Sequence, residues 1–269
     1  MKDTYFCAMV NSILYKNAKV AYHIYGAGKQ KLVLLHGFLE NAKMWDFLTK
    51  EMQHDFQIIT VDLLGHGASE CLGYVHTMEE IAETIHQVLE KEKITKATLI
   101  GHSMGGYVAL AFAEKYPDYV ERLCLLNSTS LPDSEERKQI RDRAIKMAKT
   151  NYKTLVAMSV GNLFARETHK KLVDKIEVCK QEALKTKVQG YIACSEGMKL
   201  RKNRSSVLQN GTFKKLIIGG EKDPVLDIKA IEIEANNTKT PLQVLSNGHM
   251  SHIENEEELL VVLKDFCLS

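Results

Sequence analysis

The sequence predicts an α/β fold in which helices cover both faces of a mostly parallel sheet. Short apolar runs that end in polar or glycine-containing loops alternate with segments whose apolar residues recur at helical spacing. Such alternation is typical of parallel strands joined by helical crossovers. The chain has 269 residues, of which 45% are hydrophobic and 26% charged, so one large domain with a sizeable core is expected.

Eight segments have the pattern of strands. The first two are separated by Lys16-Asn17-Ala18, which suits a hairpin-like turn. Several of the others are compact apolar runs of the kind found in buried strands. In chain order the eight are Met9–Tyr15, Val20–Tyr25, Lys31–Leu35, Ile58–Val61, Thr98–Ile100, Leu123–Leu126, Leu216–Ile218 and Val244–Leu245.

Four helices are predicted between and after these strands. Apolar residues recur at helical spacing from Met78 to Leu89. The segment Ser103–Tyr116 is rich in small residues and is followed by a proline, which cannot continue a helix. Asp227–Asn236 is a weaker helical pattern, and Glu256–Phe266 carries acidic residues in its first turn, which suits the helix dipole.

The stretch from Asp133 to Gly211 breaks the alternation, because it holds helical patterns but no convincing strand. We expect a helical cap at residues 131–211, inserted after the sixth strand into a core domain formed by residues 1–130 and 212–269. Its helical patterns cover Glu135–Lys149, Lys153–Phe164, Thr168–Leu184 and Lys187–Leu200.

Charge is distributed unevenly between these two parts. The stretch from Asp133 to Gly211 has 18 Lys/Arg and 9 Asp/Glu, whereas the remainder has 18 Lys/Arg and 25 Asp/Glu. A basic cap fits an anionic small-molecule substrate, and it also fits solvated lysines on outer helix faces. The formal net charge of +2 gives no reason to expect nucleic acid as a partner.

The cysteines and the hydropathy of the chain indicate the cellular compartment in which the protein is expected. The six cysteines form no CxxC pair, so no zinc or redox motif is indicated and reduced thiols are expected. No run approaches the ~20 apolar residues that span a bilayer, and the N-terminus lacks an apolar signal core. We therefore expect a cytoplasmic protein without a membrane span; its oligomeric state is left open. No metal-ligand cluster or phosphate-binding loop is apparent, and no cofactor is expected.

The sharpest motif is Gly101-His102-Ser103-Met104-Gly105, a G-x-S-x-G match. It follows a predicted strand and opens a predicted helix, which is the context in which this motif carries a nucleophilic serine. Glycines two positions either side of Ser103 remove side chains that would clash in so tight a turn. The helix N-terminus behind the serine favours developing negative charge.

With this motif, three further segments resemble the α/β-hydrolase superfamily over nearly the whole chain. They are His36-Gly37-Phe38, the stretch from Asp62 to Ser69, and Asn247-Gly248-His249. The resemblance implies a mostly parallel eight-stranded sheet with a variable cap after the sixth strand. It also implies a nucleophile, an acid and a histidine in that chain order.

The resemblance assigns catalysis to Ser103, Asp223 and His249. A serine hydroxyl needs a base within hydrogen-bond reach, and His249 directly follows a glycine in the loop where the family places that base. His252 is the rival base. Asp223 follows the seventh predicted strand, as the family's acid does; Glu221 is its nearest alternative.

The oxyanion hole is assigned by the same resemblance to the backbone N–H groups of Phe38 and Met104. His36 and His66 are expected to stabilise loops through hydrogen bonds and not to act as catalysts. Asp227 is expected to cap the helix that follows it.

The substrate is less defined than the chemistry. Ser103 excludes relatives that form aspartyl esters, and the leading hypothesis is hydrolysis of a small carboxylic ester through an acyl-enzyme. Alternatives are a C–C bond hydrolase, a thioesterase or a menaquinone-pathway-synthase-like enzyme, and, in another class, a slow-turnover ligand receptor. Tyr107 stands where such synthases often carry arginine. Candidate substrate-binding residues are Phe38, Met104, Met158, Phe164 and Met198.

Overall fold

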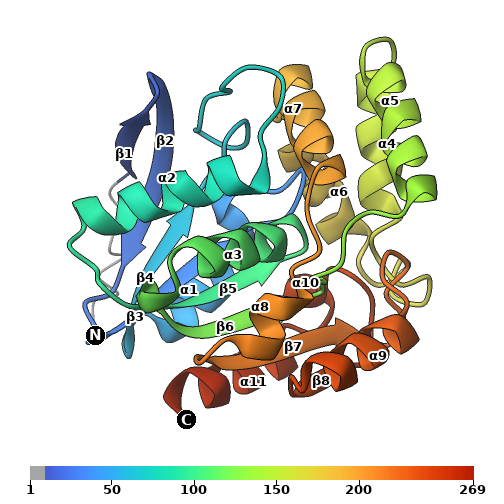
Figure 1. Cartoon of the computed structure of the whole chain (residues 1–269). Helices are drawn as coiled ribbons and strands as arrows, with labels where there is room; N and C mark the ends of the chain where they lie inside the picture. Colours follow the sequence, from blue (N-terminus) through green and yellow to red (C-terminus); the bar gives the residue numbers. More distant parts are fainter. Residues whose placement is uncertain (1–9) are drawn as a thin grey trace, which may run out of the picture.

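A computed structural model describes residues 10–269, which form one eight-stranded sheet between layers of helices (Figure 1). The strand order is β1-β2-β4-β3-β5-β6-β7-β8. The pairs β1·β2 and β2·β4 are antiparallel and all others are parallel, which confirms the predicted fold class. Met9 of the first predicted strand lies outside the described residues. The strands are β1 (Val10–Tyr15), β2 (Ala18–Tyr25), β3 (Gln30–Leu35), β4 (Phe56–Val61), β5 (Ala97–His102), β6 (Val120–Leu126), β7 (Lys214–Gly220) and β8 (Leu242–Leu245).

Alternate residues of the central strands enter two separate cores, one on each face of the sheet. Val33 and Leu35 of β3 pack with helices α2, α3 and α9, whereas Leu32 and Leu34 pack with α1 and α11. This alternation follows from the two-residue repeat of a strand, and burial on both faces explains the continuous apolar runs in the sequence. Apart from the helices between β6 and β7, the elements outside the sheet are η1 (Ala42–Trp45), α1 (Asp46–Met52), α2 (Met78–Lys91), α3 (Met104–Lys115), η2 (Pro117–Tyr119), α9 (Ile228–Thr238), α10 (Ser251–Glu254) and α11 (Glu256–Leu268).

A helical segment joins β6 to β7 and stands to one side of the sheet in Figure 1. It contains α4 (Glu135–Ala148), α5 (Tyr152–Gly161), α6 (Val173–Ala183), α7 (Val188–Lys199) and α8 (Ser205–Asn210). The first four helices share a small core with Leu39 and Met250 from the loops after β3 and β8. In contrast α8, for which no helix was predicted, packs against α3 and α9 of the sheet layer.

The helix predicted from Thr168 begins five residues later, at Val173. The hydroxyl of Thr168 donates to Glu254 at 2.7 Å, and its carbonyl accepts from the N–H groups of Lys171 and Leu172. Contacts with a segment far along the chain therefore fix a series of turns here, which local helical spacing cannot indicate.

Buried and half-buried ion pairs fasten the helical segment to itself and to the sheet layers. Asp133, whose side chain is fully buried, accepts hydrogen bonds from Arg141 and Arg201, both at 2.6 Å. Arg204 pairs with two glutamates of the sheet layers, Glu79 and Glu114. Part of the excess positive charge of the segment is thus matched by the acidic remainder of the chain.

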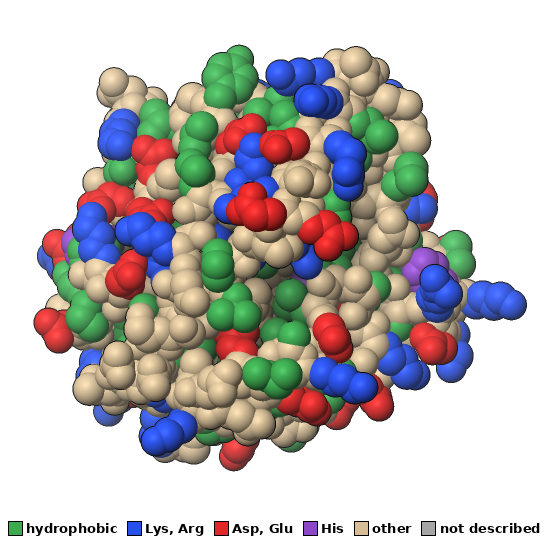
Figure 2. Space-filling view, turned by 45° about the vertical axis from the view of Figure 1, so that its right-hand side comes forward, with side chains coloured by type: hydrophobic (Ala, Val, Ile, Leu, Met, Phe, Trp, Pro, Cys, Tyr) green, Lys and Arg blue, Asp and Glu red, His purple; other side chains and the backbone are tan. Residues whose placement is uncertain are grey.

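The surface agrees with this matching of charges. On the face shown in Figure 2, Lys and Arg side chains are interspersed with Asp and Glu, and hydrophobic side chains are scattered between them. No helix of the described part of the chain is both long and apolar enough to cross a membrane.

Asp133→Ala should destabilise the fold by about 3–5 kcal/mol, because it leaves the buried Arg201 without its carboxylate. Urea unfolding monitored by circular dichroism measures the change. Asp142→Ala is the matched control: Asp142 lies on α4 with its side chain 52% exposed and pairs with Lys199, so its loss should cost less than about 1 kcal/mol. Equal effects of the two substitutions would contradict the anchoring role of Asp133.

Candidate active site

Ser103 occupies a strained turn between β5 and α3. Its backbone angles are φ 50° and ψ −113°, a conformation that a residue with a side chain rarely adopts. The turn is held by β6 and the loop after it: the N–H of Ser103 donates to the carbonyl of Leu126 at 3.0 Å, and its carbonyl accepts from the Ser128 hydroxyl at 2.7 Å. The backbone of Ser103 is therefore fixed at the carboxyl end of β5.

The glycines of the motif are required by main-chain contacts. A Cβ at Gly105 would lie 2.1 Å from the carbonyl oxygen of Leu35, and one at Gly101 would lie 2.4 Å from that of Gly105. Both separations are shorter than any real contact, and both involve backbone that cannot move aside. The helix can therefore approach the sheet this closely only with glycine at these positions.

His249 connects Ser103 to Asp223 in a chain of hydrogen bonds. Its Nδ1 lies 2.7 Å from Asp223 Oδ2, and its Nε2 lies 3.0 Å from Ser103 Oγ. Because a carboxylate only accepts, Nδ1 carries the proton, and Nε2 is left to accept from the serine hydroxyl. The three residues come from the loops after β5, β7 and β8, which meet at one edge of the parallel strands.

Asp223 is buried, with its side chain 1% exposed, and is held from three sides. Its Oδ1 accepts from the N–H groups of Val225 and Leu226, and its Oδ2 accepts from the Asn127 amide at 3.1 Å. Burial raises the pKa of Asp223, but His249 and the two backbone N–H groups bring it below its usual value, so the carboxylate is charged at neutral pH.

Two alternatives from the sequence are placed elsewhere. Glu221, the alternative acid, is exposed and outside this network. His252, the rival base, lies buried in α10, and its Nε2 faces Glu40 at 3.5 Å. Asn127 was not among the site residues predicted from the sequence. Its position at the end of β6, next to β7, is the signal that could have placed its amide beside Asp223.

The loop after β3 carries Phe38 and is held by hydrogen bonds to two buried histidines. Leu39 has a positive φ of 65°, and its N–H donates to His66 Nε2 at 3.1 Å. His36 Nε2 accepts from the N–H of Leu63 at 2.9 Å. Both histidines therefore act as neutral acceptors that stabilise loops, as predicted, and burial lowers the pKa of His66 to about 3.

The two N–H groups assigned to an oxyanion hole are free of internal acceptors. Within residues 10–269, neither the N–H of Phe38 nor that of Met104 donates a hydrogen bond to another described group. Met104 is the first residue of α3, where a helix leaves its N–H groups without intrahelical partners. Both groups are available to an added anion or oxyanion.

Four of the five candidate substrate-binding residues gather in connected apolar clusters. Phe38 is half-buried, and its ring centroid lies 4.9 Å from that of Tyr191. Phe38 packs both on the cluster that contains Met104 and Met198 and on the cluster that contains Phe164. Met158 does not join them: its side chain points outward from α5 and is 59% exposed. Met158 is therefore outside the apolar clusters that contain the other four candidates.

The helical segment reaches the His249 loop directly. The N–H of His249 donates to the carbonyl of Leu163 at 3.0 Å. One carboxylate oxygen of Glu254 accepts from the N–H of Ala165, and the other accepts from the N–H of Met250. These bonds couple the position of the loop after α5 to that of His249.

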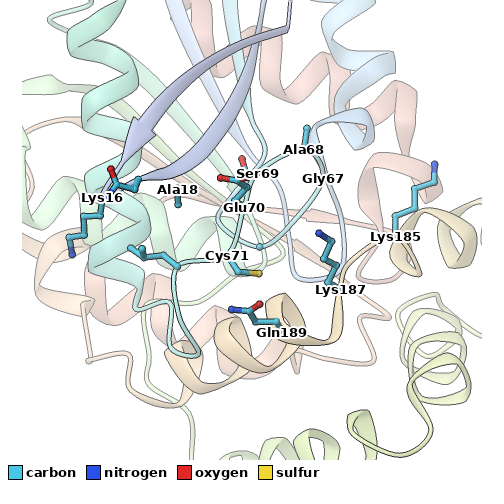
Figure 3. Close-up of a pocket in the computed structure, with 13 residues that line it drawn as sticks. Lys16, Ala18, Gly67, Ala68, Ser69, Glu70, Cys71, Lys185, Lys187 and Gln189 are labelled. Atoms are coloured by element: carbon cyan, nitrogen blue, oxygen red, sulfur yellow. The ribbon is translucent and has the colours of Figure 1, made fainter.

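A separate cavity of about 410 Å³ lies between the β1–β2 turn, the loop after β4 and the start of α7 (Figure 3). Lys16, Ser69, Glu70, Lys187 and Gln189 are among the residues that line it. Neither Ser103 nor His249 lines this cavity, so it is distinct from the site described above.

Comparisons with known proteins agree with this architecture. Residues 31–256 match the family described as alpha/beta hydrolase fold. A thermophilic esterase from Thermogutta terrifontis, solved with malate bound, is 27% identical with a TM-score of 0.90, and the match covers 96% of this chain and 98% of that one.

Two curated relatives are similar over part of their length. The acetyltransferase component of the acetoin cleaving system of Pseudomonas putida is 30% identical over 238 residues, which are 87% of this chain but only 62% of that protein. A putative 2-succinyl-6-hydroxy-2,4-cyclohexadiene-1-carboxylate synthase of Bacillus subtilis is 35% identical over 121 residues, covering 43% of this chain and 44% of that protein. With the family match over most of its length, the chain belongs to the α/β-hydrolase fold family.

Proposed function

We propose that the chain is a serine hydrolase that cleaves a small carboxylic ester through an acyl-enzyme, with Ser103, His249 and Asp223 as its catalytic triad. The observation that carries this proposal is the 3.0 Å approach of His249 Nε2 to Ser103 Oγ on a strained turn, with Asp223 on the opposite ring nitrogen. This is the arrangement by which a weak hydroxyl becomes a nucleophile.

In the first half of the reaction, Ser103 Oγ attacks the ester carbonyl while His249 Nε2 takes the hydroxyl proton. The negative charge that forms on the carbonyl oxygen is stabilised by the N–H groups of Phe38 and Met104. The C–O bond to the alcohol then breaks, and His249 returns the proton to the departing oxygen. Asp223 keeps the imidazole in the required tautomer and stabilises its charged form throughout.

In the second half, water attacks the acyl group on Ser103. His249 accepts a proton from that water, the same N–H groups stabilise the second oxyanion, and the C–O bond to Ser103 breaks. The acid is released and Ser103 recovers its proton from His249. Each step uses only groups already held in place, so little reorganisation is needed.

We infer that residues 131–211 form a cap whose apolar residues Phe164 and Met198 lie beside Phe38 and Met104 to bind the acyl or alcohol part. The esterase from Thermogutta terrifontis supports the choice of an ester. The synthase-like alternative has less support, since Tyr107 stands where such synthases often carry arginine. The neighbouring Arg201 stacks on the Tyr107 ring at 4.0 Å, and its guanidinium donates to Asp133, so this side chain is already engaged.

Ser103→Ala should abolish hydrolysis of p-nitrophenyl acetate, with a loss of at least about 10³-fold in kcat, and should prevent labelling by a fluorophosphonate probe. Ser159→Ala, on α5, is the control and should keep both activities. Wild-type protein that neither takes the label nor turns over esters would reject the hydrolase and favour a ligand receptor. Turnover that survives Ser103→Ala would reject the nucleophile.

Asp223→Asn should lower kcat by roughly 10⁴-fold, because an amide cannot hold the imidazole in the tautomer that accepts from serine. Steady-state kinetics on the same ester measure the loss. Glu221→Gln changes an exposed carboxylate two residues away and should leave kcat unchanged. A large loss in Glu221→Gln with little loss in Asp223→Asn would exchange the roles of the two acids.

Phe164→Ala should alter the preference between p-nitrophenyl butyrate and acetate, measured as a ratio of kcat/KM values, by roughly tenfold. The reason is that its buried ring adjoins the residues proposed to bind the substrate. Met158→Ala removes an exposed side chain from the neighbouring helix and should not move the ratio. An unchanged ratio in Phe164→Ala would remove this residue from the binding site.

A further inference from the structure

A second histidine–carboxylate pair lies buried directly behind the Ser103 turn. His102, the residue before Ser103, is the last residue of β5, and Glu40 lies in the loop that follows β3. Their side chains are 1% and 9% exposed, and Glu40 Oε2 is 2.7 Å from His102 Nδ1. The mechanism proposed above uses neither residue.

Both ring nitrogens of His102 face groups that can only accept a hydrogen bond. Nδ1 faces the carboxylate of Glu40, and Nε2 lies 2.9 Å from the backbone carbonyl of His249. A neutral imidazole has one N–H and could serve only one of them, so this geometry requires a proton on each nitrogen. Burial lowers the pKa of His102, but Glu40 and the carbonyl of His249 outweigh it and raise the pKa above its usual value.

Glu40 supplies the single negative charge that this imidazolium needs. Burial raises the pKa of Glu40, but His102 and, more weakly, His252 and His36 lower it to about 2. Burial lowers the pKa of His252 to about 4, so this second histidine beside Glu40 is neutral at pH 7. The negative charge of Asp223 also raises the pKa of His102. The His102 imidazolium and the Glu40 carboxylate thus form a buried pair of one cation and one anion, in which each charge compensates the other.

The pair ties together three loops of the active site. Glu40 Oε2 also accepts the N–H of Gly37 at 2.7 Å, and the N–H of Glu40 donates to the carbonyl of Gly37 at 3.3 Å, so both peptides of Gly37, including the one that carries the Phe38 N–H, are bonded to Glu40. His102 is covalently joined to Ser103, and its Nε2 holds the main chain of His249. The nucleophile, the base and one oxyanion donor are therefore all bonded, within one or two residues, to a single ion pair.

We propose that Glu40 and a doubly protonated His102 are positioning residues for the hydrolytic reaction, holding the His249 main chain and the Phe38 loop in register with Ser103. This inference rests on the proposed function only for its kinetic consequence. The charge state of His102 and its bonds to Glu40 and His249 do not depend on which substrate is cleaved.

The same three side chains could be considered as ligands of a metal ion, because one ligand atom of each of Glu40, His102 and His252 lies within 4.8 Å of the others. Two observations favour the ion pair. The 2.7 Å separation of Glu40 and His102 is that of a charge-assisted hydrogen bond. The same oxygen already accepts a backbone N–H.

The first test is kinetic. Glu40→Gln keeps an acceptor for Gly37 but removes the charge that keeps His102 doubly protonated. We expect kcat to fall by roughly 10–100-fold with KM changed less than about twofold, as for a displaced catalytic group. Glu80→Gln, which breaks a partly exposed pair with Lys16, is the matched control and should leave kcat unchanged. His102→Gln should behave like Glu40→Gln, and the double variant should lose no more than either one.

The second test reads the charge of His102 itself. In protein labelled with ¹⁵N-histidine, His102 should show two protonated ring nitrogens at pH 7, identified by their loss in His102→Gln. In Glu40→Gln only one should remain. Thermal melts and fluorophosphonate stoichiometry show whether each variant is folded and how much of it is reactive.

The outcomes separate the two proposals. Wild type without esterase activity, but with two ring N–H signals that depend on Glu40, would reject the function and keep the ion pair. A neutral His102 in active wild type would overturn the inference, as would full kcat in folded Glu40→Gln. Stoichiometric binding of added Zn²⁺ that is lost in Glu40→Gln would replace the pair by a metal site.

Discussion

The approach of α3 to the sheet at the Ser103 turn is the constraint on which the site depends. The main chain of Gly105 lies so close to the carbonyl of Leu35 that no side chain fits between them, and Ser103 is driven to a φ of 50°. The energy of that strained conformation is of order 1–3 kcal/mol and must be offset by surrounding structure. Bonds from Leu126 and Ser128 and the fully buried strands beneath supply that support.

Around this turn, the other residues of the site are held by hydrogen bonds from several loops. The Ser103 turn rests on the strands, and Asp223 is fixed by two N–H groups and Asn127. His249 lies in the loop after β8 and takes its position from the side chains of Asp223 and Ser103 and from the carbonyl of Leu163. The position of the His249 ring therefore depends on contacts from several segments, and the buried imidazole of His102 bonds to its main-chain carbonyl from behind.

Local sequence signals were sufficient for the fold class and for the Ser103 turn, whereas Asp223 and His249 were assigned by the resemblance to the α/β-hydrolase superfamily. The structure brings these three side chains together. They were insufficient where distant segments decide the outcome. Thr168 bonds to Glu254 in place of starting a helix, and Met158 faces solvent from a helix with little amphipathic pattern. The two histidines that face Glu40, His102 and His252, lie 62 or more residues away, so its buried ion pair had no local signature. The catalytic roles themselves stay predictions until activity is measured.

The bond from the His249 N–H to Leu163 has a consequence for engineering. Exchanging the segment between β6 and β7 for that of a relative is an obvious way to change what the enzyme accepts. Here such a graft would also remove the carbonyl of Leu163 and the N–H of Ala165, which are the partners of the His249 loop. A transplanted segment must reproduce these two main-chain groups, or it will shift the His249 loop as well as change the residues over the site.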